Sequence, residues 1–346
     1  MKKLVKHRVF WPAVALLALI LINAIARPNF VRITIQDGQL YGTLVEILRN
    51  SAPLMLVALG MTIVIATRGI DLSVGALMAV SGSVALTVID GSPNPEAPET
   101  IALAIGLGVL VTLIFGIWNG FLVSVLGIQP IIATLVLMLA GRGIALLITG
   151  GFITTVNSAP YKFMSQGYFA GFPFAFYVSV AAVVLVVLVE RRTALGMLTE
   201  AVGINPEASR LAGVRSRGII WGAYAASGLL AGFAGILYSS NIMAADANAA
   251  GNLIELDAIL AVVLGGTSLM GGKFTIAGTV IGVFTIQTLK STIVFFGVPS
   301  PVGPVFMACV VIVVVAFQSG LVRRAANRVV RVIHQSGTKA TPEVSS

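Results

Sequence analysis

The chain has 346 residues, of which 57% are hydrophobic and only 10% are charged, and its mean hydropathy is +1.00. About a quarter of the residues of an ordinary soluble domain are charged, so this composition excludes a water-soluble fold. The net charge of +9 comes from Lys and Arg in short segments beside apolar stretches, which indicates membrane topology and argues against nucleic-acid binding.

Ten apolar stretches follow one another along the chain, and no polar block between them is long enough to form a separate domain. A bilayer is spanned by helices of about 20 apolar residues, because backbone polar groups in lipid must be paired within the structure. We therefore predict an all-α integral membrane protein with about ten transmembrane helices, forming a single domain over residues 1–346 with a tail from about residue 320. The stretches lie near residues 9–26, 53–67, 70–89, 101–126, 131–149, 173–189, 219–239, 256–269, 274–296 and 303–317.

The first stretch has a second interpretation, because basic residues precede it and Ala24-Ile25-Ala26 resembles a signal-peptide cleavage site. Cleavage there would leave nine spans. We expect an uncleaved first helix, since its removal would explain none of the remaining charge asymmetry. With ten spans and both termini in the cytoplasm, sixteen of the 22 Lys and Arg lie inside and four outside, in agreement with the positive-inside rule.

Two short polar segments interrupt apolar sequence without room for a loop, at residues 67–75 and 265–273. At membrane depth, broken helices are tolerated where protein or water satisfies the freed backbone groups, and transporters use such ends to contact solutes. Both breaks are therefore candidate elements of a translocation pathway. A simpler interpretation is that Asp71 caps a helix beginning at Leu72. The candidate pathway residues in the breaks are Gly69, Asp71, Ser73, Gly75, Gly265, Gly266, Thr267 and Ser268.

Charged side chains within the spans are few. Arg142 lies about midway along its span, where a charge is costly unless it faces a cavity or a partner, so it joins the candidate pathway residues. Lys290 lies near the outer end of its span and is expected to extend to the interface. The second break does not match a phosphate-binding loop, since Thr267 and Phe274 replace a required glycine and a required Ser or Thr. We therefore expect no nucleotide cofactor in this chain.

Residues that could support catalysis or bind a metal are scarce. His7 and His334 lie in the basic end segments, and the only cysteine, Cys309, lies within an apolar run. No histidine or cysteine therefore has the spacing of a metal site or of an acid–base pair. We expect no catalytic residues and no metal in this chain.

The longest inside connection, residues 190–218, contains the pattern of a short helix. Asn205 suits an N-cap, Pro206 suits the first helical position, Glu207 complements the positive helix end, and Gly213 can close the helix in the left-handed conformation. This pattern predicts a two-turn helix over residues 206–212. Such a short helix is marginal alone, so we expect it to pack on neighbouring chain or on a partner. The alternative is an ordinary interfacial helix with no partner.

Several motifs in combination resemble the inner-membrane permease subunits of bacterial ABC importers for monosaccharides, the ribose, xylose and galactose class. The likeness covers nearly the whole chain, and the segments 35–38, 246–248 and 251–260 look most like the galactofuranose branch. One departure is Val202, where the family pattern Glu-Ala-Ala reads Glu200-Ala201-Val202. The motifs are Ala58–Thr62 leading into Gly69–Gly75, Asn119-Gly120, the spaced residues Ala201, Gly203, Asn205, Ala208 and Gly213, and Leu264–Ser268 with Gly271-Gly272.

The resemblance implies a type II importer fold, a permease dimer, two cytoplasmic ATPase subunits that use ATP, and a periplasmic sugar-binding protein. It adds Asn119 to the candidate pathway and places the chain in a bacterial inner membrane. It also implies that the 190–218 loop couples the ATPase to the spans. The residues implied in coupling are Glu200, Ala201, Gly203, Asn205, Pro206, Ala208 and Gly213.

The sequence leaves three other functions open. A permease of the same superfamily could carry branched-chain amino acids. A channel or ion-coupled secondary transporter is less favoured, because such proteins need buried charges for their ions and mid-span charges are scarce here. A membrane enzyme lacks a catalytic constellation. The motifs identify neither the sugar nor whether the second permease chain is a copy or a paralogue.

Overall fold

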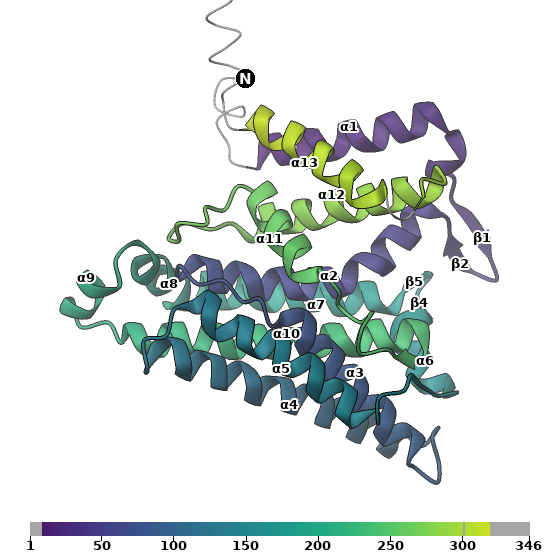
Figure 1. Cartoon of the computed structure of the whole chain (residues 1–346). Coiled ribbons are helices and arrows are strands. Elements are labelled where there is room, and N and C mark those ends of the chain that lie inside the picture. Colours follow the sequence, from purple (N-terminus) through teal and green to yellow (C-terminus); the bar gives the residue numbers. More distant parts are fainter. Residues whose placement is uncertain (1–8, 300–301, 319–346) are drawn as a thin grey trace, which may run out of the picture. The chain divides into compact units, whose positions relative to one another are not determined.

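A computed structural model of the protein describes residues 9–299 and 302–318 (Figure 1). The basic ends of the sequence, residues 1–8 and 319–346, lie outside this range, and so does the predicted tail. The described residues up to Phe295 form one compact unit. A second unit begins at Phe296 and contains α13 (Gly303–Gln318), in which Cys309 is exposed.

Helices correspond to all ten apolar stretches. Six of them are long and apolar enough to cross a membrane: α2 (Thr43–Ala66), α4 (Pro98–Ser124), α5 (Pro130–Ile148), α7 (Phe174–Arg192), α10 (Ser216–Ile242) and α12 (Ile276–Phe295). The other four are α1 (Phe10–Ala26), α3 (Val74–Asp90), α11 (Ile254–Leu264) and α13. The predicted all-α, multi-pass membrane fold is confirmed.

Short elements lie at the two ends of the first unit. One end, called the strand end, carries α6 (Ala159–Gln166), a short 3-10 helix (Pro28–Val31) and three antiparallel ribbons. The opposite end, called the α8–α9 end, carries α8 (Leu195–Ile204) and α9 (Pro206–Leu211) (Figure 1). The ribbons pair β1 (Thr34–Gln36) with β2 (Gln39–Tyr41), β3 (Thr154–Thr155) with β6 (Ala244–Ala245), and β4 (Tyr168–Phe169) with β5 (Phe172–Pro173).

α2 begins ten residues before the apolar stretch that predicted it. Its first turns contain Glu46, Arg49 and Asn50, which are too polar for an apolar-run criterion. Arg49 donates to Glu46 at 2.6 Å, so the charges satisfy each other one turn apart. Pro53 lies inside the helix and does not end it. α2 can begin before its apolar segment because these polar side chains pair with each other within the helix.

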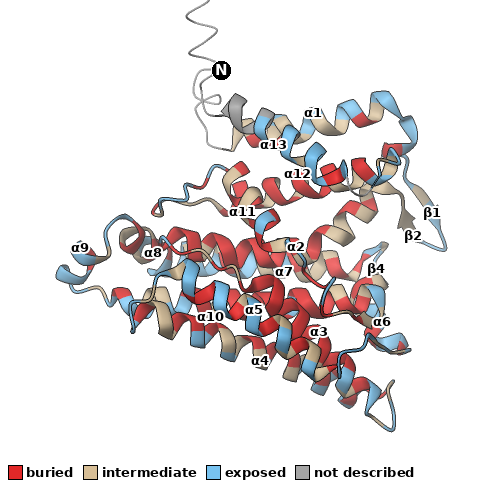
Figure 2. Cartoon of the chain, in the orientation of Figure 1, coloured by how far each residue is buried: buried red, intermediate tan, exposed pale blue. Residues whose placement is uncertain are grey.

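α10 forms the centre of the first unit and packs against α2, α3 and α4. Small residues allow these contacts: a Cβ added to Gly116 of α4 would lie 3.0 Å from the Cα of Gly228 in α10. In lipid, such close backbone approach replaces the hydrophobic drive that assembles soluble helices. Figure 2 shows buried residues concentrated along α2, α3 and α10. Leu103, Leu110 and Ile114 on α4 remain exposed, as expected for a face toward lipid.

Candidate functional site

The first break lies between α2 and α3 and centres on Asp71, whose side chain is fully buried. Its Oδ1 accepts hydrogen bonds from the backbone N–H (3.0 Å) and the hydroxyl (2.6 Å) of Ser73. Its Oδ2 accepts from the Ser227 hydroxyl of α10 at 2.7 Å. Asn119 of α4 completes the cluster by donating to Ser73 Oγ at 3.0 Å. A buried carboxylate needs such donors, because burial without them is costly.

This cluster corrects the simpler interpretation of Asp71. The helix begins at Val74 and not at Leu72, and no side chain caps its first turn. Ser73 stands directly before the helix. Asp71 instead connects the break to α10, and through Ser73 to α4. Three predicted pathway residues, Asp71, Ser73 and Asn119, are thus brought together by the fold.

The second break lies between α11 and α12. Gly265 packs so closely on Gly278 that a Cβ on either residue would overlap the backbone of the other. Gly266 has a φ of +85°, which glycine adopts without strain. Thr267 Oγ1 accepts from the backbone N–H of Thr275 at 3.4 Å, across the break. The glycines therefore permit a sharp reversal between two helices in contact.

A junction of six residues joins both breaks to the α8–α9 end. Arg68, next to Gly69 in the first break, donates from Nη2 to the Ile204 carbonyl (2.6 Å) and from Nε to the Met270 carbonyl (3.0 Å). Gly272 of the second break donates its N–H to the Ala66 carbonyl at 2.9 Å. A Cβ on Gly203 would overlap both of those backbone atoms. We call this set the break junction: Ala66, Arg68, Gly203, Ile204, Met270 and Gly272.

Sequence reasoning missed the role of Arg68. Arg68 counted only as one of the positive charges on the cytoplasmic side, although it is a lone arginine in a polar segment between two apolar runs. Its φ of +66° is uncommon for a residue with a side chain. That backbone conformation and its two carbonyl acceptors identify it as a positioning residue.

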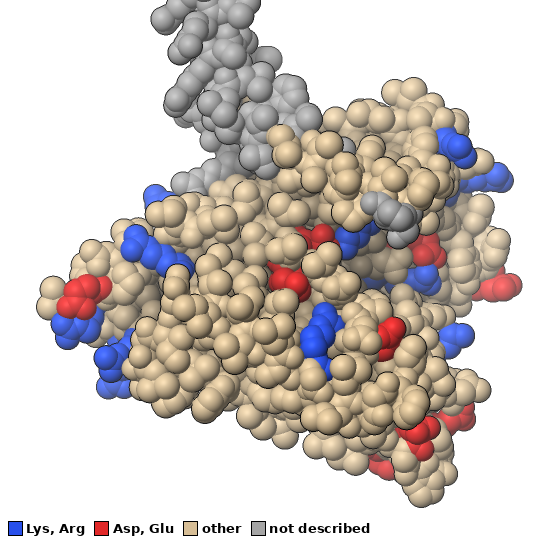
Figure 3. Space-filling model, in the orientation of Figure 1, with Lys and Arg blue, Asp and Glu red and all other residues tan. Residues whose placement is uncertain are grey.

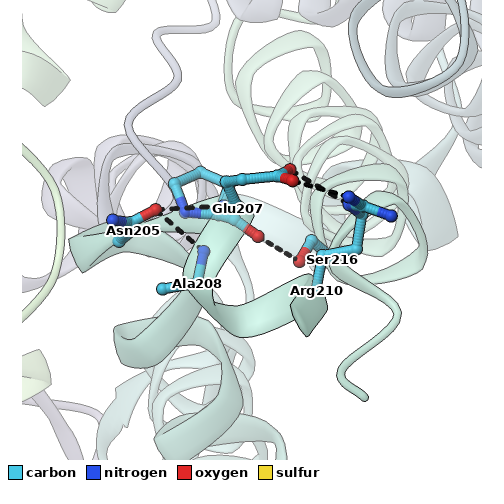
Figure 4. A network of polar contacts seen from close by, with 6 residues as sticks. Asn205, Glu207, Ala208, Arg210 and Ser216 are labelled. Carbon is cyan, nitrogen blue, oxygen red and sulfur yellow. Dashed lines mark hydrogen bonds and ion pairs between the residues drawn. The ribbon is translucent and has the colours of Figure 1, made fainter. Parts of the chain in front are cut away.

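The capped helix predicted in the loop is present as α9, and it ends at Leu211, one residue earlier than expected. Asn205 Oδ1 accepts from the N–H groups of Glu207 (3.1 Å) and Ala208 (3.0 Å) (Figure 4). Gly213 closes the helix with a φ of +86°, and the Val214 N–H bonds back to the Ser209 carbonyl at 2.9 Å. The predicted capping roles of Asn205 and Gly213 are both confirmed.

The outer face of α9 is open to solvent. Ala208 is exposed, and Leu211 is 76% exposed, which is unusual for a leucine on so short a helix. Glu207 and Arg210 form an ion pair one turn apart at 2.6 Å (Figure 4). The hydrogen bond from Arg210 lowers the pKa of Glu207 below its usual range. Of the other predicted coupling residues, Gly203 is buried in the break junction, while Glu200 and Ala201 are half-buried on α8.

Arg142 and Gly75 meet a different segment, the 246–253 loop that precedes α11. Arg142 donates from Nη1 to the carbonyls of Ala247 (2.7 Å) and Ala250. A Cβ on Gly75 would overlap the Gly251 carbonyl. These two predicted pathway residues therefore hold the loop against α3 and α5. Lys290 pairs with Asp257 on α11 and keeps a partly exposed side chain, and its extension to the interface stays a prediction.

Residues 43–315 match the model of a family described as "Branched-chain amino acid transport system / permease component". The chain belongs to this permease family. It is 46% identical to the galactofuranose transporter permease of Escherichia coli K12, over 91% of this chain and 92% of that one. It is 43% identical to a fructose import permease of Bifidobacterium longum (92% and 89%) and 36% to a ribose import permease of Bacillus subtilis (84% and 86%).

No solved structure matches the chain. The resemblance to permeases of sugar importers that the motifs indicated is confirmed by these relatives. The matched region of this permease contains both breaks, the break junction and the capped α9.

Proposed function

We propose that this permease is the membrane-spanning subunit of an ATP-driven sugar importer, and that it couples to a separate ATPase through the α8–α9 end. The observation that carries the proposal is the break junction. α9 is an exposed, capped helix to which a partner could bind. Only Asn205 separates it from Ile204, the last residue of α8, whose carbonyl accepts a hydrogen bond from Arg68. A displacement of α9 therefore acts on both helix breaks at once.

The geometry supports a mechanical role in several ways. α8 and α9 are separated by a single residue, Asn205, so a displacement of α9 would be passed directly to the end of α8. Arg68 joins the end of α8 to both breaks, and the Gly272 to Ala66 hydrogen bond joins the breaks to each other. Packed elements of this kind shift between discrete arrangements and do not deform gradually. Closure of an ATPase pair beneath α9 would thus tilt α3 and α12 where each begins.

This role implies an orientation of the chain in the membrane and a set of partner proteins. The α8–α9 end would face the cytoplasm, with both termini, and the strand end would face the periplasm, as sixteen of 22 Lys and Arg on the inner side favour. ATP would be bound by the ATPase, with no cofactor in this chain. A periplasmic sugar-binding protein would deliver to the strand end, and a second permease chain, identical or paralogous, would complete the pathway in a bacterial inner membrane.

The substrate class rests on the relatives, whose names specify galactofuranose, fructose and ribose. The family description names branched-chain amino acids instead, which keeps that substrate as the alternative. The candidate pathway remains Gly69, Asp71, Ser73, Gly75, Asn119, Arg142 and the second break. The candidate coupling residues remain the seven residues of the 190–218 loop already named.

Reconstitution tests the proposal directly. The chain would be co-expressed with an ATPase and a periplasmic binding protein sought in the neighbouring reading frames, purified, and placed in proteoliposomes with ATP enclosed in the vesicles. We expect co-purification of the ATPase, and uptake of labelled D-galactose, D-fructose or D-ribose in preference to L-leucine. Ala208→Arg, on the exposed face of α9, should abolish co-purification while membrane insertion persists. ATP-independent uptake, or preferential leucine uptake, would contradict the proposal.

A further inference from the structure

A pocket of about 240 Å³ lies within the first unit, in the half of the bundle nearer the strand end. Its wall includes residues from α2, α6, α10, α11 and α12. Gln287 lies eight residues before the end of α12 at Phe295, so the pocket reaches about 12 Å inward along that helix. α11 has only 11 residues and starts partway down the bundle, and its first residue, Ile254, lines the pocket.

The pocket is lined by hydrogen-bonding side chains. Within the described part of the chain, the side chains of Ser165, Tyr238, Asn241 and Gln287 form no hydrogen bond to another residue. Their polar atoms are also not among those sealed from solvent without a partner. The Asn241 backbone is fixed, because its carbonyl accepts from Gln166 Nε2 at 2.5 Å. Two amides, a hydroxyl and a phenol are therefore free to bind a solute.

The charges of the pocket are already neutralised. Arg49 pairs with Glu46 at 2.6 Å, and Lys290 pairs with Asp257. Figure 3 shows that the face of the molecule in view is largely uncharged, with Lys and Arg side chains beside Asp and Glu side chains at some places. Pro53, Leu54 and Ile254 give the pocket an apolar part, but a zwitterionic amino acid would also need two unpaired charges of opposite sign. A neutral solute with several hydroxyl groups matches the uncharged hydrogen-bonding side chains of the pocket.

We propose that this pocket is the site where the permease receives the sugar, with Asn241, Gln287 and Ser165 binding hydroxyls and Tyr238 lying against the apolar face of the ring. The proposal rests on the proposed function and extends it, because none of these four residues belongs to the breaks or to the α8–α9 end. The volume lies below the ~300–1,000 Å³ of sites for drug-sized ligands, a size that suits a monosaccharide. Amide and hydroxyl groups with an aromatic ring are the chemistry that recognises such a solute.

Thiol labelling tests the site in the full chain. Cys309 is the only cysteine, so Cys309→Ser provides a background without thiols. Asn241→Cys in this background places a thiol in the pocket, and Ile242→Cys, at the neighbouring residue that is exposed and does not line it, is the matched control. Intact cells would be treated with a membrane-impermeant thiol reagent. The probes are D-galactose, D-fructose, D-ribose and L-leucine, each added separately.

We expect the sugar that the wild type imports to slow labelling at residue 241 at least threefold, to leave residue 242 unchanged, and L-leucine to slow neither. No labelling at 241, no protection by the imported sugar, or protection by leucine overturns the pocket. If the wild type imports none of the three sugars, the proposed function fails and the pocket inference fails with it. A wild type that imports sugar without protection at 241 overturns the pocket alone.

Transport by a second variant provides an independent measurement. Gln287→Leu keeps the size of the side chain and removes its amide, so maximal sugar uptake should fall about threefold to tenfold, the effect of one hydrogen bond. ATPase co-purification should remain at the wild-type level, since the residue lies far from α9. Ile242→Ala should leave uptake unchanged. Normal uptake by Gln287→Leu would count against the site, and a parallel loss of co-purification would indicate a folding defect instead of a sugar contact.

Discussion

Gly203→Ala probes the break junction with a single methyl group. Gly203 is the penultimate residue of α8, and it is buried against both helix breaks. A Cβ there would overlap the Ala66 carbonyl oxygen and the Gly272 nitrogen. Those two atoms are joined by a 2.9 Å hydrogen bond, and both belong to backbone that cannot rotate away. The methyl group must therefore push α8 away from the breaks or separate the breaks from each other.

The loss of folding stability has two parts, the inserted methyl group and the lost hydrogen bond. Inserting a methyl group into closely packed structure costs about 1–3 kcal/mol, and a lost backbone hydrogen bond about 1 kcal/mol more. The total, about 2–4 kcal/mol, is smaller than the typical stability of a folded protein, ~5–15 kcal/mol, so the variant should still fold. Gly222→Ala on α10 is the matched control, since nothing lies within 4 Å of the added Cβ. There alanine should be neutral or favourable by up to about 1 kcal/mol.

The assay combines thermal unfolding in detergent with the ratio of sugar imported to ATP hydrolysed in proteoliposomes. Gly203→Ala should lower Tm by several degrees and reduce import more than hydrolysis, because the exposed face of α9, the proposed contact with the ATPase, is unchanged. Gly222→Ala should match the wild type in both measurements. If Gly203→Ala shows the Tm and the coupling ratio of the control, the break junction does not transmit motion.

Arg68→Met should reduce import at least tenfold while the ATPase still binds, because it removes both carbonyl contacts; unchanged coupling in proteoliposomes would contradict this. Asp71→Ala should impair uptake more than membrane abundance, since three donated hydrogen bonds lose their acceptor, whereas a proportional loss would make Asp71 a purely structural residue. Gly213→Val should cost about 1–2 kcal/mol at a left-handed position and weaken ATPase co-purification; normal co-purification would exclude α9 as the docking helix. Because Arg210 lowers the pKa of Glu207, their pairing should stabilise α9 fully above about pH 4.3 and be lost as pH falls through the lowered value. Amide-exchange protection of α9 in wild type and Glu207→Gln should therefore differ near neutral pH and converge in strong acid, and a difference that persists there refutes the pairing.

Local sequence was sufficient to predict the helices of the ten apolar stretches and α9. Each apolar stretch is a property of its own residues, because lipid requires the backbone to satisfy its hydrogen bonds locally. The ends of α9 follow from Asn205, Pro206 and Gly213, all within the helix or beside it. The start of α2 was missed for the complementary reason, since its polar first turns carry no apolar signal.

Contacts between distant segments could not be predicted in this way. Arg68 reaches Ile204 and Met270, which lie 136 and 202 residues further along the chain. Asp71 finds Ser227 across a similar separation, which is why a local cap was the natural expectation for it. The pocket lined by Asn241 and Gln287 also has no motif, because its residues come from five helices with no fixed spacing between them.

The buried carboxylate of Asp71 also has a consequence for biosynthesis. Ser227, which donates to its Oδ2, follows 156 residues later. At about 5–20 residues per second, a ribosome needs roughly 8–30 s to synthesise that interval. During this time α2 and α3 have left the ribosome while the carboxylate lacks the donor on α10. The first break must therefore stay hydrated until α10 arrives, so α2 and α3 reach their final packing only after most of the chain has been made.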